Sequence, residues 1–207
     1  MINDIREIVK TGYERGNYAG LFRTSTNLKE IENKFLGRLS TLLTKNARIL
    51  DLGCGNGIPF DIYLCKKGFQ ITGIDFALNH IIAARRNVPG ATFIKGDFST
   101  TDFGGNPFQA ILAFYSIFHI PKEEHRNLID KIYKSLENGG YILVTIGTFS
   151  GDGLEENWAG SKMAWSSHNP SNYKKIFTQV GFQIIENEYE GQPGDQEHHW
   201  WVLARKK

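Results

Sequence analysis

An apolar strand that runs into three glycines on alternate positions, Ile49-Leu50-Asp51-Leu52-Gly53-Cys54-Gly55-Asn56-Gly57, constrains the fold of this chain more than any other feature. Glycine is required where the backbone takes positive φ or lets a ligand approach closely, and a helix after such a turn points free N–H groups into the gap. Dinucleotide-binding loops carry Gly-x-Gly-x-x-Gly, which would need a glycine where this chain has Ile58. The loop therefore predicts a nucleotide-like ligand of another kind. A tight turn that binds nothing is the alternative.

Length and composition limit the class of protein. The 207 residues suit one domain, and 24 Lys and Arg against 22 Asp and Glu leave a formal net charge of +2, too small to indicate a nucleic-acid partner. The two cysteines, Cys54 and Cys65, match no metal or redox spacing, so we expect no metal. No apolar run approaches the roughly 20 residues that cross a bilayer. We therefore expect a cytoplasmic monomer or homodimer without membrane contact.

Alternating helical and extended patterns predict βαβ units and a mainly parallel sheet. Asn27 and Glu30 form a candidate helix cap ahead of an apolar stripe at helical spacing. The predicted strands cover 47–52, 69–75, 92–95, 108–115, 141–146, 182–189 and 198–204, and the predicted helices cover 59–67, 78–87, 122–136 and the segment from Pro170 to Gly181. Only a Gly/Pro loop separates the last two strands, so they should form an antiparallel hairpin.

Acidic residues stand at the ends of three successive predicted strands. Asp51 ends the first, and Asp75 ends the second, about twenty positions beyond Gly53, where a carboxylate can bind both ribose hydroxyls of a nucleotide. Asp97 and Phe98 follow the third and offer an acceptor for an exocyclic amine beside an apolar ring. Each acid alone could be a helix cap or turn residue. Ligands bind beyond the carboxyl ends of strands in open parallel sheets, so we expect the three acids at one site.

These segments resemble the class I S-adenosylmethionine-dependent methyltransferases of the small-molecule type. The run from Asp51 to Gly57 resembles the first motif of the family, Gly73-Ile74-Asp75-Phe76 the second, and Gly96-Asp97-Phe98 the adenine-contacting segment. The segments 108–116 and 136–143 are similar to its fourth strand and to the stretch entering the fifth. The resemblance implies an α/β, Rossmann-like three-layer sandwich with a seven-stranded, mostly parallel sheet and a C-terminal antiparallel hairpin. It also implies S-adenosylmethionine as the cofactor and S-adenosylhomocysteine as the product.

By resemblance, residues at the strand ends hold this cofactor. Asp51 and the loop of Gly53, Cys54, Gly55 and Gly57 would hold the methionine part, Asp75 the ribose, Phe76 an adenine face, and Asp97 with Phe98 the adenine edge. Carbonyl groups at Ala113, Phe114 and Tyr115 would favour the sulfonium, and Tyr13 and Tyr18 resemble residues that fold over the cofactor. Gln109 stands where many members carry an acid that supports the first motif, which puts that contact in question.

We expect residues 1–46 to form a helical cap, 47–146 the cofactor-binding core, and 147–207 an acceptor-side loop, helix and hairpin. The strand at 108–115 runs into Ser116-Ile117-Phe118-His119-Ile120-Pro121, which lacks the Asn/Asp-Pro-Pro-aromatic sequence of methyltransferases that act on base amines. His119 is the candidate general base, titrating near neutral pH, unless it only caps the next helix. His125 should face solvent.

All four tryptophans follow the strand at 141–146. The stretch 147–169 is expected to be a long loop in the acceptor wall, with Trp165 and His168 as contacts, and His199 on the last strand is a further candidate. Trp200 and Trp201 should point to opposite faces of that strand. The predicted function is methyl transfer to a small-molecule acceptor. The alternatives are an RNA or protein methyltransferase, a non-catalytic S-adenosylmethionine-binding protein and, third, an NAD(P) oxidoreductase.

Overall fold

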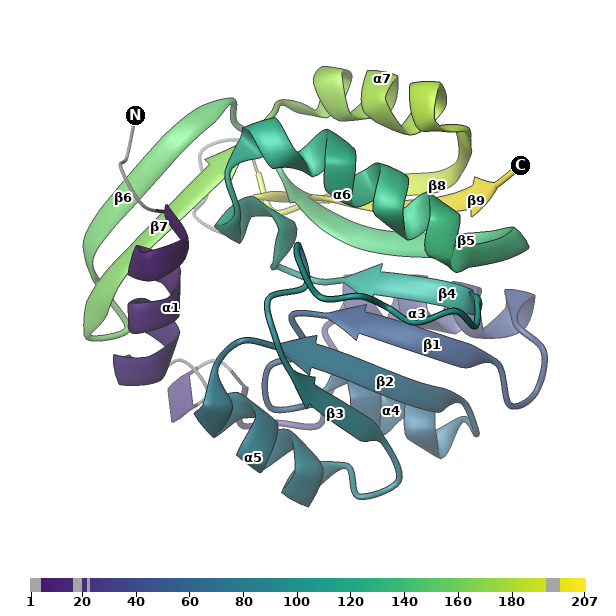
Figure 1. Cartoon of the computed structure of the whole chain (residues 1–207), viewed down its shortest axis with the longest axis horizontal. Coiled ribbons are helices and arrows are strands. Elements are labelled where there is room, and N and C mark those ends of the chain that lie inside the picture. The colour runs from purple at the N-terminus through teal and green to yellow at the C-terminus, as the bar shows by residue number, and fades with distance from the viewer. Residues whose placement is uncertain (1–4, 17–19, 22, 193–197) are drawn as a thin grey trace.

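Parallel strands with helices on both faces form the centre of the molecule, seen in a computed structural model that describes residues 5–16, 20–21, 23–192 and 198–207 (Figure 1). The helices are α1 (Ile5–Arg15), α3 (Glu30–Leu42), α4 (Phe60–Lys66), α5 (Leu78–Asn87), α6 (Lys122–Ser135) and α7 (Pro170–Val180), with a 3₁₀ turn η1 (Ile117–His119). The strands are β1 (Arg48–Leu52), β2 (Gln70–Asp75), β3 (Thr92–Lys95), β4 (Phe108–Ala113), β5 (Leu136–Gly147), β6 (Gly151–Trp158), β7 (Ser161–Ser167), β8 (Phe182–Glu190) and β9 (His199–Lys206).

The main sheet has seven strands in the order β3-β2-β1-β4-β5-β9-β8. The strands β1 to β5 run parallel, and β9 lies antiparallel to both β5 and β8. The winding direction reverses between β1 and β4, which places the opening for a ligand at their carboxyl ends. The predicted fold class, including the C-terminal antiparallel hairpin, is confirmed.

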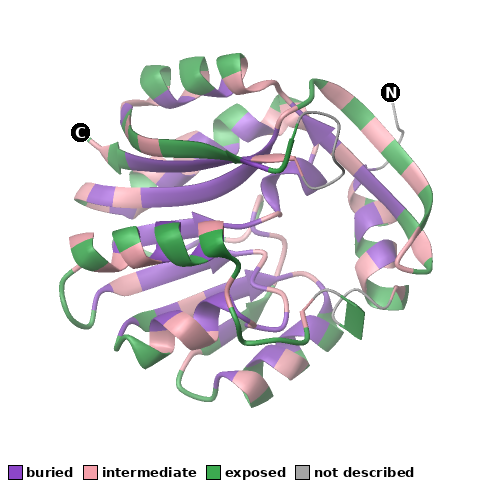
Figure 2. Ribbon diagram, turned by 180° about the vertical axis from the view of Figure 1, so that it is seen from behind, coloured by how far each residue is buried: buried purple, intermediate pink, exposed green. Residues whose placement is uncertain are grey.

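Apolar residues fill both faces of this sheet, and Figure 2 shows that burial concentrates on the strands and on the inward sides of the helices. On one face α6 and α7 cover the core that contains Leu50 and Trp200. On the other face α3 and α4 cover the core that contains Ile49 and Trp201. The two tryptophans are fully buried on opposite faces, as strand alternation predicts. They hold the hairpin strand β9 between the two helical layers.

A second, two-stranded sheet replaces the long loop expected at 147–169, so that expectation is wrong. β6 and β7 pair antiparallel, and the turn between them has Ala159 at φ 49° and Gly160 at φ 86°. Two positive φ angles are the geometry of the preferred two-residue hairpin turn. Helix α1 packs on β7, and a Cβ at Gly12 would lie 2.6 Å from the Lys162 carbonyl oxygen. The glycine therefore lets helix and strand approach closely.

Two local expectations also need correction. Helix α3 begins at Glu30 after Lys29, whose backbone N–H donates to the Glu32 carboxylate at 2.9 Å, so Asn27 is not the cap. His125 is fully buried, not solvent-facing, because its ring bonds the Tyr173 hydroxyl at 2.7 Å and the Ile120 carbonyl at 3.0 Å. Among the described residues, no helix combines the length and apolar character of a membrane span.

Candidate active site

A pocket lies beyond the carboxyl ends of β1, β2 and β4, and residues of the segments 53–60 and 114–119 supply much of its lining. Helix α1 and the β6–β7 hairpin stand across this end of the sheet (Figure 1). Residues from six separate stretches of the chain line the pocket: Tyr13, Arg23, Gly53, Cys54, Gly55, Asn56, Ile58, Phe60, Asp75, Phe76, His80, Phe98, Phe114, Tyr115, Ser116 and His119.

The loop after β1 has the positive-φ backbone that its glycines predict. Gly53, Gly55 and Gly57 take φ of 80°, 55° and 76°. A Cβ at Gly53 would lie 2.6 Å from the Ser116 Cβ, and one at Gly57 would lie 2.9 Å from a Val88 methyl. These two glycines are therefore needed for packing as well as for conformation.

Asp75 ends β2 inside the pocket and is 6% exposed. Its Oδ2 accepts from the Gly55 N–H at 2.9 Å, and its Oδ1 accepts from the Ala77 N–H at 2.8 Å. His80 Nδ1 lies 3.4 Å from Oδ1. The carboxylate thus ties the glycine loop to the start of α5, and each oxygen retains a second lone pair for a ligand hydroxyl.

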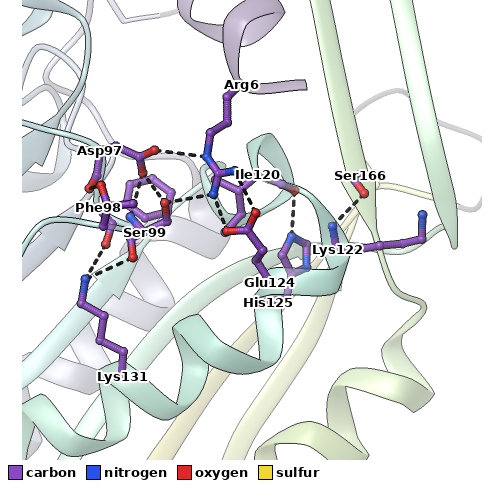
Figure 3. Close-up of polar contacts among 11 residues, drawn as sticks. Arg6, Asp97, Phe98, Ser99, Ile120, Lys122, Glu124, His125, Lys131 and Ser166 are labelled. Carbon is purple, nitrogen blue, oxygen red and sulfur yellow. Dashed lines mark hydrogen bonds and ion pairs between the residues drawn. The ribbon is translucent and has the colours of Figure 1, made fainter. Parts of the chain in front are cut away.

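Asp97 lies outside the pocket lining and holds helix α1 instead (Figure 3). Its Oδ1 accepts from the Ser99 N–H at 2.8 Å and from the Ser99 hydroxyl at 2.6 Å, and its Oδ2 lies 3.2 Å from Arg6 Nε. Arg6 also donates to both carboxylate oxygens of Glu124 on α6. This hydrogen-bonded ion pair lowers the pKa of Glu124. Arg6 therefore links α1 to the loop after β3 and to α6, while Phe98 is buried against the pocket.

Tyr13 and His119 form a hydrogen-bonded pair in the pocket. The Tyr13 hydroxyl lies 2.9 Å from His119 Nε2, and His119 Nδ1 lies 3.0 Å from the Ala164 carbonyl oxygen. A carbonyl only accepts, so Nδ1 carries the proton and Nε2 accepts from Tyr13. Burial lowers the pKa of His119 to about 4, which keeps the ring neutral at neutral pH. The expected titration near neutrality is therefore wrong for this residue.

Tyr115 follows β4 at φ 53°, a left-handed conformation that is costly for an aromatic residue. Its hydroxyl donates to Glu190 Oε2 at 2.8 Å, and Trp201 Nε1 donates to the same oxygen at 3.0 Å. Burial opposes ionisation of Glu190, but hydrogen bonds from His199, Trp201 and Tyr115 lower its pKa to about 2. The ionised carboxylate thus fixes Tyr115 at the pocket wall.

Several candidates lie outside the pocket lining. Ala113 is fully buried in the core, and the ring of His199 packs against the rings of Tyr115 and Phe118. The indole of Trp165 covers Gly153 of the paired strand, where a Cβ would lie 2.0 Å from Nε1, and His168 Nε2 lies 2.9 Å from the Lys122 carbonyl oxygen. Tyr18 lies outside the described residues. The acceptor roles of Trp165, His168 and His199 stay predictions.

The pocket also contains residues that sequence reasoning did not assign. The Arg23 guanidinium carbon lies 4.9 Å from the Phe60 ring centroid and 5.1 Å from that of Tyr115. Asn56 Nδ2 donates to the Arg23 carbonyl at 2.9 Å, which joins the N-terminal segment to the glycine loop. The Ser116 hydroxyl donates to the Leu52 carbonyl at 2.7 Å. Of these residues, only Asn56 could have been expected from the sequence, because it lies inside the glycine motif. Arg23 is far from the glycine loop in sequence.

Polar side chains of β1 and of the neighbouring elements β4 and α4 are buried or hydrogen-bonded. Gln109 Oε1 accepts from the Arg48 N–H, at the start of β1, at 2.6 Å. Asp51 is 2% exposed and Asp61 of α4 is fully buried. The two carboxyls interact with each other, and burial raises the pKa of both.

Comparisons with known proteins match this geometry. The family described as "Methyltransferase domain" matches residues 49–140. The chain is 29% identical, over 94% of its length, to an S-adenosyl-L-methionine-dependent Diels-Alderase of Neonectria sp. and covers 81% of that protein. It is 29% identical to a sterol 24-C-methyltransferase of Debaryomyces hansenii over 75% of its length, and 31% identical to a phosphoethanolamine N-methyltransferase of Plasmodium falciparum over 61%. It spans only 44% and 45% of these two relatives.

Solved structures share the fold. Magnesium protoporphyrin IX methyltransferase from Synechocystis PCC 6803, solved with bound S-adenosylmethionine, superposes with a TM-score of 0.73 at 14% identity and covers 99% of this chain and 98% of its own. A protein from Methanosarcina mazei, described as a SAM-dependent methyltransferase, superposes with a TM-score of 0.71 at 18% identity, covering 87% and 98% of the two chains.

Proposed function

The chain is a class I S-adenosylmethionine-dependent methyltransferase, and we propose that its acceptor is a small molecule that enters the pocket beside Tyr13 and His119. The bound cofactor supplies an activated methyl group on a sulfonium, with S-adenosylhomocysteine as the product. The acceptor class and the residue roles below are inferences from the pocket.

The pocket residues fit this cofactor. We assign the ribose hydroxyls to Asp75, an adenine face to Phe76 and Phe98, and the methionine part to the loop of Gly53 to Gly57. Asp51 places a buried carboxyl two residues before Gly53 of this loop, a suitable neighbour for an α-ammonium group. Arg23, whose guanidinium also lies 3.7 Å from the buried Glu32 carboxylate, lines the same pocket and suits an α-carboxylate. The chain therefore offers complementary charge to both ends of the amino-acid part.

The Tyr13–His119 pair carries the proposal of a small acceptor. The pair sits in the same pocket as the glycine loop, yet His119 is only 8% exposed. Helix α1 and the β6–β7 hairpin pack together across this end of the sheet, with Trp158 against the Tyr13 ring at 5.6 Å. A group on a folded macromolecule would have to pass these elements to reach Nε2, whereas a small molecule can be enclosed by them.

The same pair defines a route for a proton. Nε2 of His119 is the basic atom, because Nδ1 is protonated and bound to Ala164. In our proposal an acceptor hydroxyl or amine bonds the Tyr13 oxygen, its proton moves to that oxygen, and the Tyr13 proton moves to Nε2. The nucleophile then attacks the methyl carbon in line. Positioning and exclusion of water supply most of the acceleration in such a site.

The test separates acceptors by size. Purified protein is incubated with methyl-labelled S-adenosylmethionine and a cell extract that ultrafiltration has divided into small-molecule and macromolecular fractions. We expect label in products from the small-molecule fraction, and its loss with His119→Ala. His198→Ala is the matched control, because His198 is half-buried and bonds Thr148 away from the pocket. Label in RNA or protein with wild-type enzyme would overturn the proposal, as would cofactor binding without turnover on either fraction.

A further inference from the structure

The ammonium group of Lys131, on α6, is bound to the loop that follows β3 (Figure 3). Its Nζ donates to the carbonyl oxygens of Phe98 at 3.0 Å and of Ser99 at 3.4 Å, and also to that of Thr101. It lies 3.9 Å from the ring centroid of the buried Phe103. An ammonium group has three N–H donors, so one lysine can satisfy three carbonyls of a single loop.

The loop binds its own N–H groups, with one exception. The Asp97 carboxylate accepts from the Ser99 N–H at 2.8 Å, and the Asp97 carbonyl accepts from the N–H groups of Thr100 at 3.1 Å and Thr101 at 2.8 Å. Of the N–H groups at 98–101, only that of Phe98 has no acceptor in the described part of the chain. Phe98 lines the pocket, so this N–H is a donor that a bound ligand can use.

The direction of the Phe98 N–H follows from the turn that these bonds build. The Asp97 carbonyl and the Phe98 N–H belong to one planar peptide group and point in opposite directions. Because the carbonyl accepts from Thr100 and Thr101 inside the turn, the N–H points out of the turn. Lys131 binds the following carbonyls of the same turn and therefore keeps this peptide group in place.

We propose that Lys131 is a positioning residue for the selection of adenine. It holds the turn so that the Phe98 N–H donates to N1 at the edge of the base, an acceptor in adenine. Lys131 does not line the pocket, so it acts through the backbone of the loop. The side chain of Asp97 does not line the pocket either, because its carboxylate binds Ser99 and Arg6. This inference rests on the assignment of adenine to Phe98 in the proposed function, and the acceptor plays no part in it.

Loss of the ammonium group should weaken the recognition of N1 more than binding as a whole. The assigned ribose contact, Asp75, and the glycine loop have no contact with Lys131 among the described hydrogen bonds. In Lys131→Met three loop carbonyls lose their donor, so the turn can rearrange and the Phe98 N–H loses its fixed direction. A role in folding stability alone would weaken every ligand that binds the folded protein by the same factor.

Two ligands measure this recognition. One is S-adenosylhomocysteine, and the other is its 1-deaza analogue, in which a C–H group replaces N1 and the exocyclic amine is kept. We expect calorimetry to show that wild-type protein binds the analogue about tenfold more weakly, because the Phe98 donor is left unpaired. In Lys131→Met the ratio of the two Kd values should fall to about twofold or less, chiefly through weaker binding of S-adenosylhomocysteine. Lys131→Arg keeps a cation with several N–H donors and should retain most of the ratio.

Lys134→Met is the matched control, because Lys134 lies on the same helix, is exposed and contacts Asp130 instead of the loop. It should keep the wild-type ratio. Lys131→Gln takes the place of the methionine variant if that variant fails to fold, since one shorter amide cannot bind three carbonyls, and the same loss is expected.

The outcomes separate this inference from the proposed function. A wild-type ratio near one would overturn the reading of N1 by Phe98 and, with it, the role of Lys131. A ratio that stays at the wild-type value in Lys131→Met, or falls equally in Lys134→Met, would overturn the role of Lys131 and leave the proposed function standing. Failure of the small-molecule acceptor would appear in the labelling experiment and leave these binding constants unchanged.

Discussion

The Tyr13 hydroxyl lies 2.9 Å from His119 Nε2, although 106 positions separate the two residues in the chain. The bond joins α1 to the turn η1 at the carboxyl edge of the sheet, so folding of the N-terminal helix completes the pocket. Because Ala164 fixes the proton on Nδ1, Tyr13 is the donor and the lone pair of Nε2 accepts its hydroxyl proton.

Removing the Tyr13 hydroxyl tests the proton route. Tyr13→Phe keeps the ring that packs on Phe76 and Trp158 but removes the O–H, so we expect turnover to fall roughly 10²-fold while the cofactor Kd stays within a few fold. The rate should show no ionisation of His119 between pH 6 and 8, because its pKa is about 4. Tyr63→Phe, on α4 outside the pocket lining, is the control. A wild-type pKa near 6.5 that disappears with His119→Ala would contradict this assignment.

Asp75 should dominate binding of the ribose. Asp75→Ala removes a carboxylate able to bind two hydroxyls and also frees the Gly55 N–H, so we expect cofactor affinity to fall about tenfold or more. Calorimetry with S-adenosylhomocysteine measures the change. Asp102→Ala removes a carboxylate that accepts a backbone N–H, from Gly104, away from the pocket and should leave affinity unchanged. Unchanged affinity in Asp75→Ala would exclude the ribose assignment.

Arg6 should control how firmly α1 closes the site. Arg6→Ala removes its contacts with Asp97 and Glu124, which are partly exposed and worth about 1 kcal/mol in sum. We expect S-adenosylhomocysteine to dissociate about fivefold faster and α1 to be cleaved sooner by protease. Stopped-flow tryptophan fluorescence gives the dissociation rate. The control is Arg38→Ala, which breaks a contact with Glu186 away from α1. This variant should release the ligand at the wild-type rate. Equal dissociation rates for the Arg6 and Arg38 variants would refute the role of Arg6.

His125 should make stability depend on pH. Burial lowers its pKa to about 4, so protonation favours the unfolded chain, and this contribution is present above about pH 6.5 and lost as pH falls toward 4. His125→Asn retains an acceptor for the Tyr173 hydroxyl but cannot be protonated. Wild-type protein should lose roughly 3 kcal/mol relative to this variant between pH 7 and pH 4. Urea unfolding at both pH values measures the difference, and a pH-independent difference would show that His125 titrates normally.

The tryptophans of the hairpin should differ in effect. Trp158 contacts the Tyr13 ring, whereas Trp165 covers Gly153 of its own hairpin. We therefore expect Trp158→Phe to raise the acceptor KM at least severalfold, with a smaller effect of Trp165→Phe and little change in cofactor affinity for either. A larger effect of Trp165 would restore the sequence-based choice of that residue and show that the hairpin rearranges around the acceptor.

The sequence predicts the parts of this protein that depend on local rules. Alternate glycines after Ile49 to Leu52 require a strand and a positive-φ turn, and the segments around Asp75 and Asp97 repeat the strand pattern at regular spacing. These rules predict the mostly parallel sheet and the antiparallel pairing of β8 and β9, both of which are confirmed.

The remaining features depend on contacts between distant segments. The β6–β7 hairpin turns at Ala159-Gly160, and alanine at positive φ gives no turn signal in sequence. Nothing near Arg6 indicates that it binds Asp97, and nothing near Arg23 indicates that it reaches the glycine loop. The burial of His119 likewise follows from the packing of α1 and β7, so its low pKa could not be read from the residue type.

A crystal structure with S-adenosylhomocysteine tests the central claim most directly. We predict ribose hydroxyls on Asp75, the amino-acid part against the loop of Gly53 to Gly57, and the sulfur facing an enclosed space bounded by Tyr13 and His119. That arrangement would place the transferred methyl where only a small acceptor can reach it. A sulfur that points to open solvent, with Tyr13 and His119 remote from it, would contradict the account.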